Sequence, residues 1–126
     1  MLKRRSREAL FMSKKTDKVF LLDIQEAIRR IEIYIKGLNY QDFLQKIETQ
    51  DAVLRNLEII GEAVKNISLD LKKKYKNIQW KEIAGMRDKI IHFYFGVNLD
   101  IVWQTIKDKL PELKEKIENI LKEIEI

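Results

Sequence analysis

The stretch DKVFLLDIQEAIRRIEIYIKGL, residues 17–38, decides the class of fold. Its apolar residues return at steps of three and four, the spacing of one side of a helix, and they are Phe20, Ile24, Ile28, Ile31, Ile35 and Leu38. Thr16 or Asp17 is expected to cap the start of this helix. Gly37 lies near its end, where a left-handed residue is often needed. The stretch therefore predicts a long helix with one apolar stripe.

The composition of the whole chain is that of a folded helical protein. Its 126 residues are 45% hydrophobic and 36% charged, with 4 glycines and 1 proline. This length suits one domain with a single core. Lys, Glu, Leu and Ile favour helices, and we expect no sheet.

Further helical patterns follow the first one. A short helix is expected over residues 41–47 and a helix with apolar residues on more than one face over residues 49–68. Gly61 in that helix is expected to permit close packing against a neighbour. After a polar connection, the next helix is expected from Trp80 to about residue 95, with Gly96 as its C-terminal signal. Together these patterns predict an all-α, antiparallel bundle of four to five helices.

The last helical pattern, residues 99–126, allows two interpretations. Asn98 can cap its start, and Pro111 either kinks it or begins a new helix. Its apolar residues form a narrow seam: Ile106, Leu110, Leu113, Ile117, Ile120 and Ile124. The seam favours one more helix of the bundle, with a contact to a second subunit as the alternative.

Charge and cysteine content narrow the classes of function. The chain has no cysteine and one histidine, which excludes disulfides, thiolate zinc sites and multi-histidine metal sites, so we expect no metal. No apolar run reaches the roughly 18 residues of a membrane span, so the expected location is the cytoplasm. Residues 1–15 hold six positive side chains and one negative, which accounts for the net charge of +5. We expect a disordered basic tail over residues 1–15 and a single domain over residues 16–126.

The stretch GMRDKIIHFYFG, residues 85–96, holds the only histidine, His92, together with Arg87 and Tyr94. A histidine can take and give a proton near neutral pH, and an arginine can stabilise negative charge on a phosphate. The two could cut RNA without a metal if His92 deprotonates a ribose 2′-hydroxyl. Residues five apart on a regular helix point about 140° apart, so the two would meet only if the flexible arginine reaches round the helix, the helix end near Gly96 loosens, or a second subunit supplies its own Arg and His. The alternative is a structural histidine, and Tyr94 could simply close the core.

Nearby charged residues could support such a site. A basic cluster interleaved with Tyr75 and Trp80 could bind RNA; it comprises Lys72, Lys73, Lys74, Lys76 and Lys81. A solvated charge run with aromatic residues in the core is the favoured alternative. Glu58 and Glu62 could orient Arg87 or His92, although pairing with Arg55 or Lys65 at the surface is slightly favoured. Asp88 could partly offset the charge of Arg87.

The stretch MRDKIIHFYFGVNLDIVWQTI resembles the signature of HepT-like toxins of the HEPN superfamily, an arginine, four residues, a histidine, one residue and a tyrosine. DAVLRNLEIIGEAVKNIS and IQWKEIAGMRD are similar to the segments that precede this signature in the family. The resemblance covers about residues 17–121. It implies a HEPN-like helical bundle that forms a homodimer and acts as a metal-independent endoribonuclease. Arg87 would then be the phosphate and transition-state ligand, and His92 the acid and base, at a cleft shared by two subunits.

The resemblance also implies a toxin–antitoxin pair. Its partner would be a minimal nucleotidyltransferase antitoxin that transfers AMP from ATP to Tyr94. The added bulk and negative charge would block RNA from the cleft. No cofactor is expected. The competing interpretation is a helical binding module that docks a nucleotidyltransferase without cutting RNA.

Overall fold

The computed structural model describes the backbone of residues 7–92 and 98–124, and the side chains of residues 7, 16–89 and 98–124. Its elements are α1 (Arg7–Ile35), α2 (Tyr40–Gln45), α3 (Ile47–Asn66), α4 (Leu69–Lys74), α5 (Trp80–His92), α6 (Leu99–Gln104), a π-helical segment (Thr105–Lys109) and α7 (Leu110–Glu123). Every regular element within these residues is helical. The prediction of an all-α fold is therefore confirmed.

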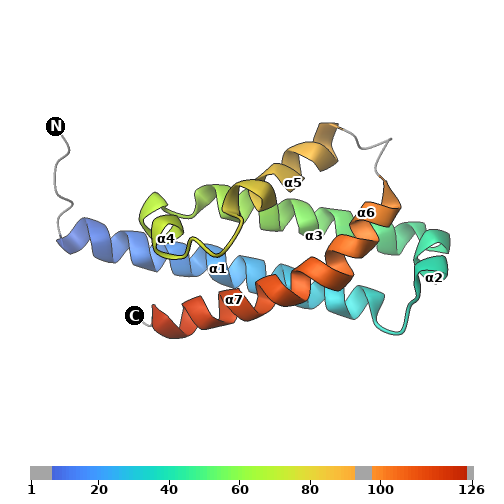
Figure 1. Cartoon of the computed structure of the whole chain (residues 1–126), viewed down its shortest axis with the longest axis horizontal. Helices are drawn as coiled ribbons and strands as arrows, with labels where there is room; N and C mark the ends of the chain where they lie inside the picture. The colour runs from blue at the N-terminus through green and yellow to red at the C-terminus, as the bar shows by residue number, and fades with distance from the viewer. Residues whose placement is uncertain (1–6, 93–97, 125–126) are drawn as a thin grey trace.

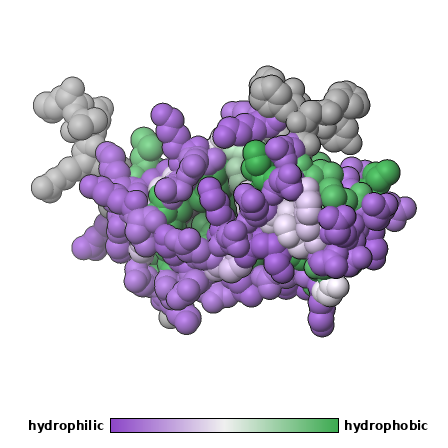
Figure 2. Space-filling view, turned by 45° about the vertical axis from the view of Figure 1, so that its right-hand side comes forward, coloured by the Kyte–Doolittle hydropathy of each residue, from purple (hydrophilic) through white to green (hydrophobic). Residues whose placement is uncertain are grey.

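Successive long helices run in opposite directions along the molecule (Figure 1). Helix α1 packs against α3 and α7, and α3 packs against α5 on its other side. The short helices α2 and α4 lie at the turns of the bundle, at its opposite ends. Hydrophilic side chains cover most of the face seen in Figure 2, with hydrophobic ones showing between them. Within the described ranges, no helix is both long and apolar enough to cross a membrane.

Helix α1 buries the centre of the predicted stripe and ends as predicted, but it begins earlier. Ile24, Ile28 and Ile31 are almost completely buried, whereas Phe20 and Ile35 are only partly buried. Gly37, two residues after the helix, has a φ of +76°. The helix starts at Arg7, so the expected cap at Thr16 or Asp17 is wrong. The part of the expected disordered tail that the structure describes is the first two turns of α1. The boundary between a tail and a domain at residue 16 stays a prediction.

Asp17, inside α1, has a different role. Its side chain is 3% exposed, and its carboxylate accepts hydrogen bonds from the backbone N of Ser68 at 2.8 Å and from the Ser68 hydroxyl at 2.6 Å. The same hydroxyl oxygen of Ser68 accepts a hydrogen bond from Leu71 N at 3.3 Å and caps α4. A buried carboxylate is costly unless such donors surround it. Asp17 therefore ties the first half of α1 to the turn between α3 and α4.

The last predicted apolar stripe is buried within the bundle of this chain. All six of its residues, Ile106, Leu110, Leu113, Ile117, Ile120 and Ile124, are at most 8% exposed. The interpretation as a bundle helix is therefore confirmed, and the stripe is not free for a second subunit. The predicted dimer, if it forms, must use another surface.

Pro111 begins a new helix, as one of the two alternatives stated. It is the second residue of α7, and the π-helical segment Thr105–Lys109 joins α7 to α6. A proline has no N–H to give to the carbonyl four residues earlier, and its ring crowds that carbonyl. A wider π turn directly before the proline relieves this conflict without ending the rod of helix. Asn98 caps α6 as predicted, accepting a hydrogen bond from Asp100 N at 2.9 Å.

Candidate active site on helix α5

Helix α5 is held against α3 by an unusually close approach at Gly61. A Cβ atom at Gly61 would lie 2.9 Å from Arg87 Cβ, 3.1 Å from Arg87 N and 3.3 Å from the Ile83 carbonyl oxygen. Only a residue without a side chain leaves room for α5 at this distance. The predicted role of Gly61 in close packing is confirmed. The neighbour that it admits is the backbone of Arg87 itself.

The guanidinium of Arg87 is held by Glu62, the neighbour of Gly61 on α3, and by Asp88 on α5. Arg87 Nε lies 2.8 Å from Glu62 Oε2, and Arg87 Nη1 lies 3.5 Å from Asp88 Oδ1. Asp88 also accepts a hydrogen bond from Lys65 Nζ at 2.9 Å. The Arg87 side chain is 37% exposed, so its terminal amino groups remain within reach of solvent. These contacts orient a cation at the surface of the α3–α5 pair, with donors left over for a phosphate.

Glu58 and Glu62 of α3 therefore differ in their partners. Glu62 pairs with Arg87, as the less favoured alternative proposed, rather than with Lys65 at the surface. Glu58, one turn earlier, lies 3.6 Å from Arg55 and forms the expected surface pair. Asp88 lies close enough to Arg87 to offset part of its charge, as expected.

His92 is the last residue of α5, and the backbone is α-helical from Arg87 to His92. The helix therefore does not loosen between these two residues, and their positions leave the axis about 140° apart. The side chain of His92, and Tyr94 and Gly96 entirely, lie outside the described residues. The roles predicted for His92 and Tyr94 stay predictions.

The predicted basic cluster lies near the first turn of α5. Lys73, Lys74, Lys76 and Lys81 are exposed, and Lys72 is half-buried. Trp80 is only 7% exposed, and its Nε1 donates to the Tyr75 carbonyl oxygen at 2.9 Å. Because Trp80 is buried, it offers no stacking face, as the alternative of core aromatics stated. RNA binding by the lysines stays a prediction.

Tyr75, which directly follows α4, connects that helix to the end of α7. Its hydroxyl donates a hydrogen bond to the Glu123 carboxylate at the end of α7. Partial burial, together with this hydrogen bond to a negative group, raises the pKa of Tyr75 to about 12. Tyr75 therefore contributes to packing rather than to a free aromatic surface.

Comparison with known proteins places this chain in a family. The family model described as "Ribonuclease HepT-like" matches residues 24–120, which include Arg87, His92 and Tyr94. The chain belongs to the HepT-like ribonuclease family. The expected family resemblance is confirmed.

Individual relatives of this HepT-like chain match it over most of their length. A Thermococcus cleftensis protein named "Probable ribonuclease HepT" is 49% identical over 109 residues, which cover 86% of this chain and 99% of that protein. A Methanocaldococcus jannaschii protein named as a candidate RNase is 47% identical over 114 residues, 90% of this chain and 94% of the relative. Another candidate RNase, from Caldanaerobacter subterraneus, is 44% identical over 107 residues, 85% of this chain and 96% of the relative. No solved structure is similar enough to match.

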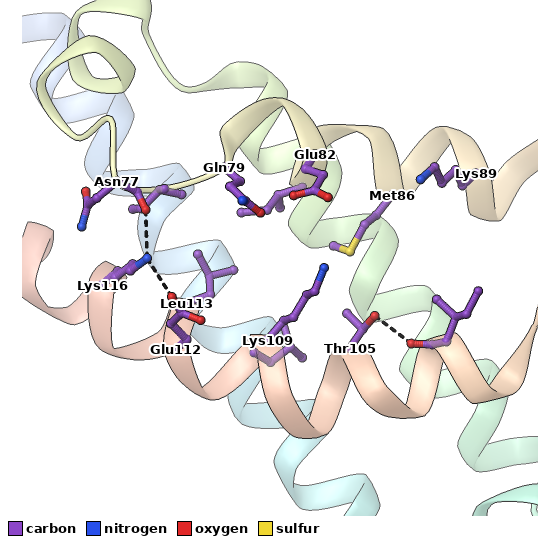
Figure 3. Close-up of a pocket in the computed structure, with 14 residues that line it drawn as sticks. Asn77, Gln79, Glu82, Met86, Lys89, Thr105, Lys109, Glu112, Leu113 and Lys116 are labelled. Carbon is purple, nitrogen blue, oxygen red and sulfur yellow. Dashed lines mark hydrogen bonds and ion pairs between the residues drawn. The ribbon is translucent and has the colours of Figure 1, made fainter.

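A groove on the other side of α5 was not expected from the sequence. It lies between α5 and the rod formed by α6, the π-helical segment and α7, and has a volume of about 430 Å³ (Figure 3). Helix α5 lines it with Glu82, Met86 and Lys89, and the opposite wall carries Thr105 and Lys109. Glu82, Met86 and Lys89 follow one another at steps of four and three and therefore share one face of α5. Because two of the three are charged, a search for apolar stripes overlooks this face.

Proposed function

We propose that this HepT-like chain is an endoribonuclease that cuts RNA with Arg87 and His92. The observation that carries the proposal is the ion pair of 2.8 Å between Arg87 and Glu62. Arg87 precedes the only histidine of the sequence, His92, by five residues. A surface arginine held in one place by a neighbouring helix suits a group that must meet a phosphate with little loss of entropy. The names of the relatives as ribonucleases, at 44–49% identity, support the same activity.

The proposed reaction needs no metal. The imidazole of His92 takes the proton of a ribose 2′-hydroxyl, and that oxygen attacks the adjacent phosphorus. The bond from phosphorus to the 5′-oxygen breaks, and the leaving oxygen takes a proton from an imidazolium. The products are a 2′,3′-cyclic phosphate and a free 5′-hydroxyl. Arg87 donates hydrogen bonds to the phosphate oxygens as negative charge builds up in the transition state.

A homodimer would complete the site. The unbroken helix from Arg87 to His92 supports this, because the two positions diverge by about 140° around its axis within one chain. A two-fold axis beside the C-terminal half of α5 would bring the Arg87 of one copy near the His92 of the other. The imidazolium formed in the first step can return its proton to the leaving 5′-oxygen, so one Arg87 and one His92 make a complete site.

The regulation that we propose acts on Tyr94. A minimal nucleotidyltransferase antitoxin would transfer AMP from ATP to the tyrosine hydroxyl, with release of pyrophosphate. Tyr94 lies two residues after His92 in the sequence, so the adenylate would add bulk and negative charge beside the imidazole. The pair would then form a toxin–antitoxin system.

Incubation with total RNA tests the activity. The wild type, Arg87→Ala and His92→Ala are compared in the presence of a chelator, with Arg55→Ala as control because Arg55 is a 70% exposed arginine of α3. We expect cleavage by the wild type and the control only. Intact mass must show that the wild type carries no AMP. Unmodified wild type that leaves RNA intact would favour a binding module that docks the nucleotidyltransferase without cutting RNA.

A further inference from the structure

The groove between α5 and the α6–α7 rod lies close to Arg87 but on another side of its helix. Met86 precedes Arg87 and Lys89 follows it by two residues, and both line the groove, whereas Arg87 itself turns toward Glu62 on α3. Helix α5 thus separates the groove from the Arg87–Glu62 pair by its own width. A ligand in the groove would lie within about one helical turn of Arg87 along the axis.

The floor of the groove is apolar. Ile83, Met86, Leu110 and Leu113 contribute to its lining, and Ile101 at its edge is 61% exposed. An exposed isoleucine beside an apolar hollow offers contact area to a flat apolar ligand. The volume of about 430 Å³ is within the range of sites that hold one small molecule of nucleotide size.

Two cations on the groove walls lack acidic partners. Lys89 projects from α5 and Lys109 from the π-helical segment on the opposite side (Figure 3), and neither forms an ion pair with any described residue. Lys116, by contrast, is neutralised, because its Nζ lies 3.0 Å from Glu112 Oε1 and 2.9 Å from the Asn77 carbonyl oxygen. Two free ammonium groups facing one hollow suit an anion such as a phosphate.

Glu82 is the carboxylate in the lining that no described cation neutralises. Because this carboxylate would repel an anion, the groove does not suit an anion without other polar groups. A carboxylate and the amide of neighbouring Gln79 can accept hydrogen bonds from hydroxyl and amino groups. A ribonucleotide combines these features: a phosphate, ribose hydroxyls and a flat base.

The π-helical segment places one of the cations. Thr105 and Lys109 are its first and last residues, and both line the groove. The Thr105 hydroxyl donates to the Ile101 carbonyl oxygen at 2.8 Å, which supports the backbone at the groove edge. The wider turn before Pro111 changes the direction in which Lys109 leaves the rod, and such turns recur at functional sites.

We propose that this groove, here called the α5–α6 groove, binds one nucleotide of a single-stranded RNA substrate beside the cleavage site. Lys89 and Lys109 bind its phosphates, and the base lies on the apolar floor against Met86 and Ile101. The proposal rests on the proposed ribonuclease function and adds to it a subsite outside the Arg87–His92 motif. Binding by charge and apolar contact would select single strands with little preference for sequence.

Binding of a short fluorescent single-stranded RNA to the full-length protein tests the groove. The His92→Ala background prevents cleavage, and fluorescence anisotropy is recorded over a range of salt concentrations. The double variant Lys89→Gln/Lys109→Gln is expected to bind about tenfold more weakly or worse, with the salt slope lowered by about 1.4 for two lost phosphate contacts. Ile101→Ala is expected to weaken binding several-fold with the salt slope unchanged, because it removes only apolar contact.

The matched control is Lys36→Gln/Lys46→Gln, which removes the same charge from exposed lysines directly after α1 and α2. The proposal predicts that this variant binds as its parent does. Lys73→Gln/Lys76→Gln is measured beside it as a test of the predicted basic cluster, and loss of binding in that variant, with none in the groove variant, would overturn the proposal in favour of the cluster. A groove variant that changes oligomeric state and binds RNA as before would show instead that the groove contacts a second copy.

The activity and the groove can fail separately. Cleavage of the same RNA by protein with an intact His92 is measured beside the binding assay. If the wild type cuts RNA and the groove variant does so with the same KM and kcat, the proposed groove is wrong and the proposed nuclease activity stands. If the protein binds RNA through the groove but never cuts it, the nuclease activity is wrong and the groove stands.

Discussion

Glu62 on α3 and Arg87 on α5 form an ion pair of 2.8 Å between Oε2 and Nε, directly beside the point where Gly61 lets the two helices approach closely. Neighbouring residues of α3 thus control both the position of the α5 backbone and the direction of its arginine. The pair is 54% and 37% exposed, so its contribution to stability is at most about 1 kcal/mol. Its value lies in orientation.

Replacement of Glu62 by glutamine should therefore reduce activity more than stability. The amide keeps the shape of the side chain but loses the charge that holds the guanidinium. We expect kcat for RNA cleavage to fall about 3- to 10-fold, the equivalent of roughly 1 kcal/mol of transition-state stabilisation, with the melting temperature nearly unchanged. Glu58→Gln is the control, since Glu58 pairs with Arg55 one turn away. Equal kcat in both variants would remove Glu62 from the site.

The two glycines of the α3–α5 region should respond in opposite ways to alanine. Gly61→Ala would place a Cβ 2.9 Å from Arg87 Cβ, so α5 must move, at a cost of about 1–3 kcal/mol. Gly85→Ala adds a Cβ that meets nothing within 4 Å and should stabilise the helix by about 0.5–1 kcal/mol. Urea unfolding of both variants measures the difference. A Gly61→Ala protein as stable as the wild type would contradict the close approach.

The stripes of the long helices could be predicted because they repeat within one element. The burial of Ile24, Ile28 and Ile31, the left-handed Gly37 and the close packing at Gly61 all follow from local spacing or backbone freedom. The start of α1 could not be predicted in this way. Asp17 looks like a cap in sequence, but its carboxylate serves Ser68, 51 positions later, and only the tertiary fold brings the two together.

The candidate site shows the same division. The motif residues were predicted from the family resemblance, but the partner of Arg87 was not, since pairing of Glu62 with Lys65 at the surface was slightly favoured. The packing at Gly61 decides the matter by bringing Arg87 within reach. The groove was overlooked because its two walls lie in separate helices and one of them depends on a π turn.

Tyr75 makes stability sensitive to alkaline pH. Its pKa is raised to about 12 by partial burial and by its hydrogen bond to Glu123, above the value near 10 of an unfolded chain. A raised pKa in the folded state means stability that is present below about pH 10 and is lost as pH rises toward 12. Tyr75→Phe should show a smaller fall in unfolding free energy over this window. Its absorbance titration should lack the last tyrosinate step, and a step that persists would assign that pKa to another tyrosine.

Tyr94 should be the only acceptor of AMP. The purified protein is incubated with ATP, Mg²⁺ and a minimal nucleotidyltransferase, and intact mass is compared for the wild type and Tyr94→Phe. We expect an adenylate on the wild type only, and loss of RNA cleavage in proportion to the modified fraction, because the added phosphate repels RNA. Tyr34→Phe, an exposed tyrosine on α1, is the control and should be modified as the wild type is. A mass increase that survives in Tyr94→Phe would assign the modification elsewhere.

The most direct test of a shared catalytic site mixes two inactive proteins. Arg87→Ala and His92→Ala should each lower cleavage by at least about 100-fold, since one lacks the phosphate ligand and the other the base. In a mixed dimer, Arg87 of one copy and His92 of the other restore one complete site. After subunit exchange, we predict that the mixture regains a substantial part of wild-type cleavage in chelator. Mixed dimers that form, as seen by native mass, but stay as inactive as either variant alone would contradict a site shared between two copies.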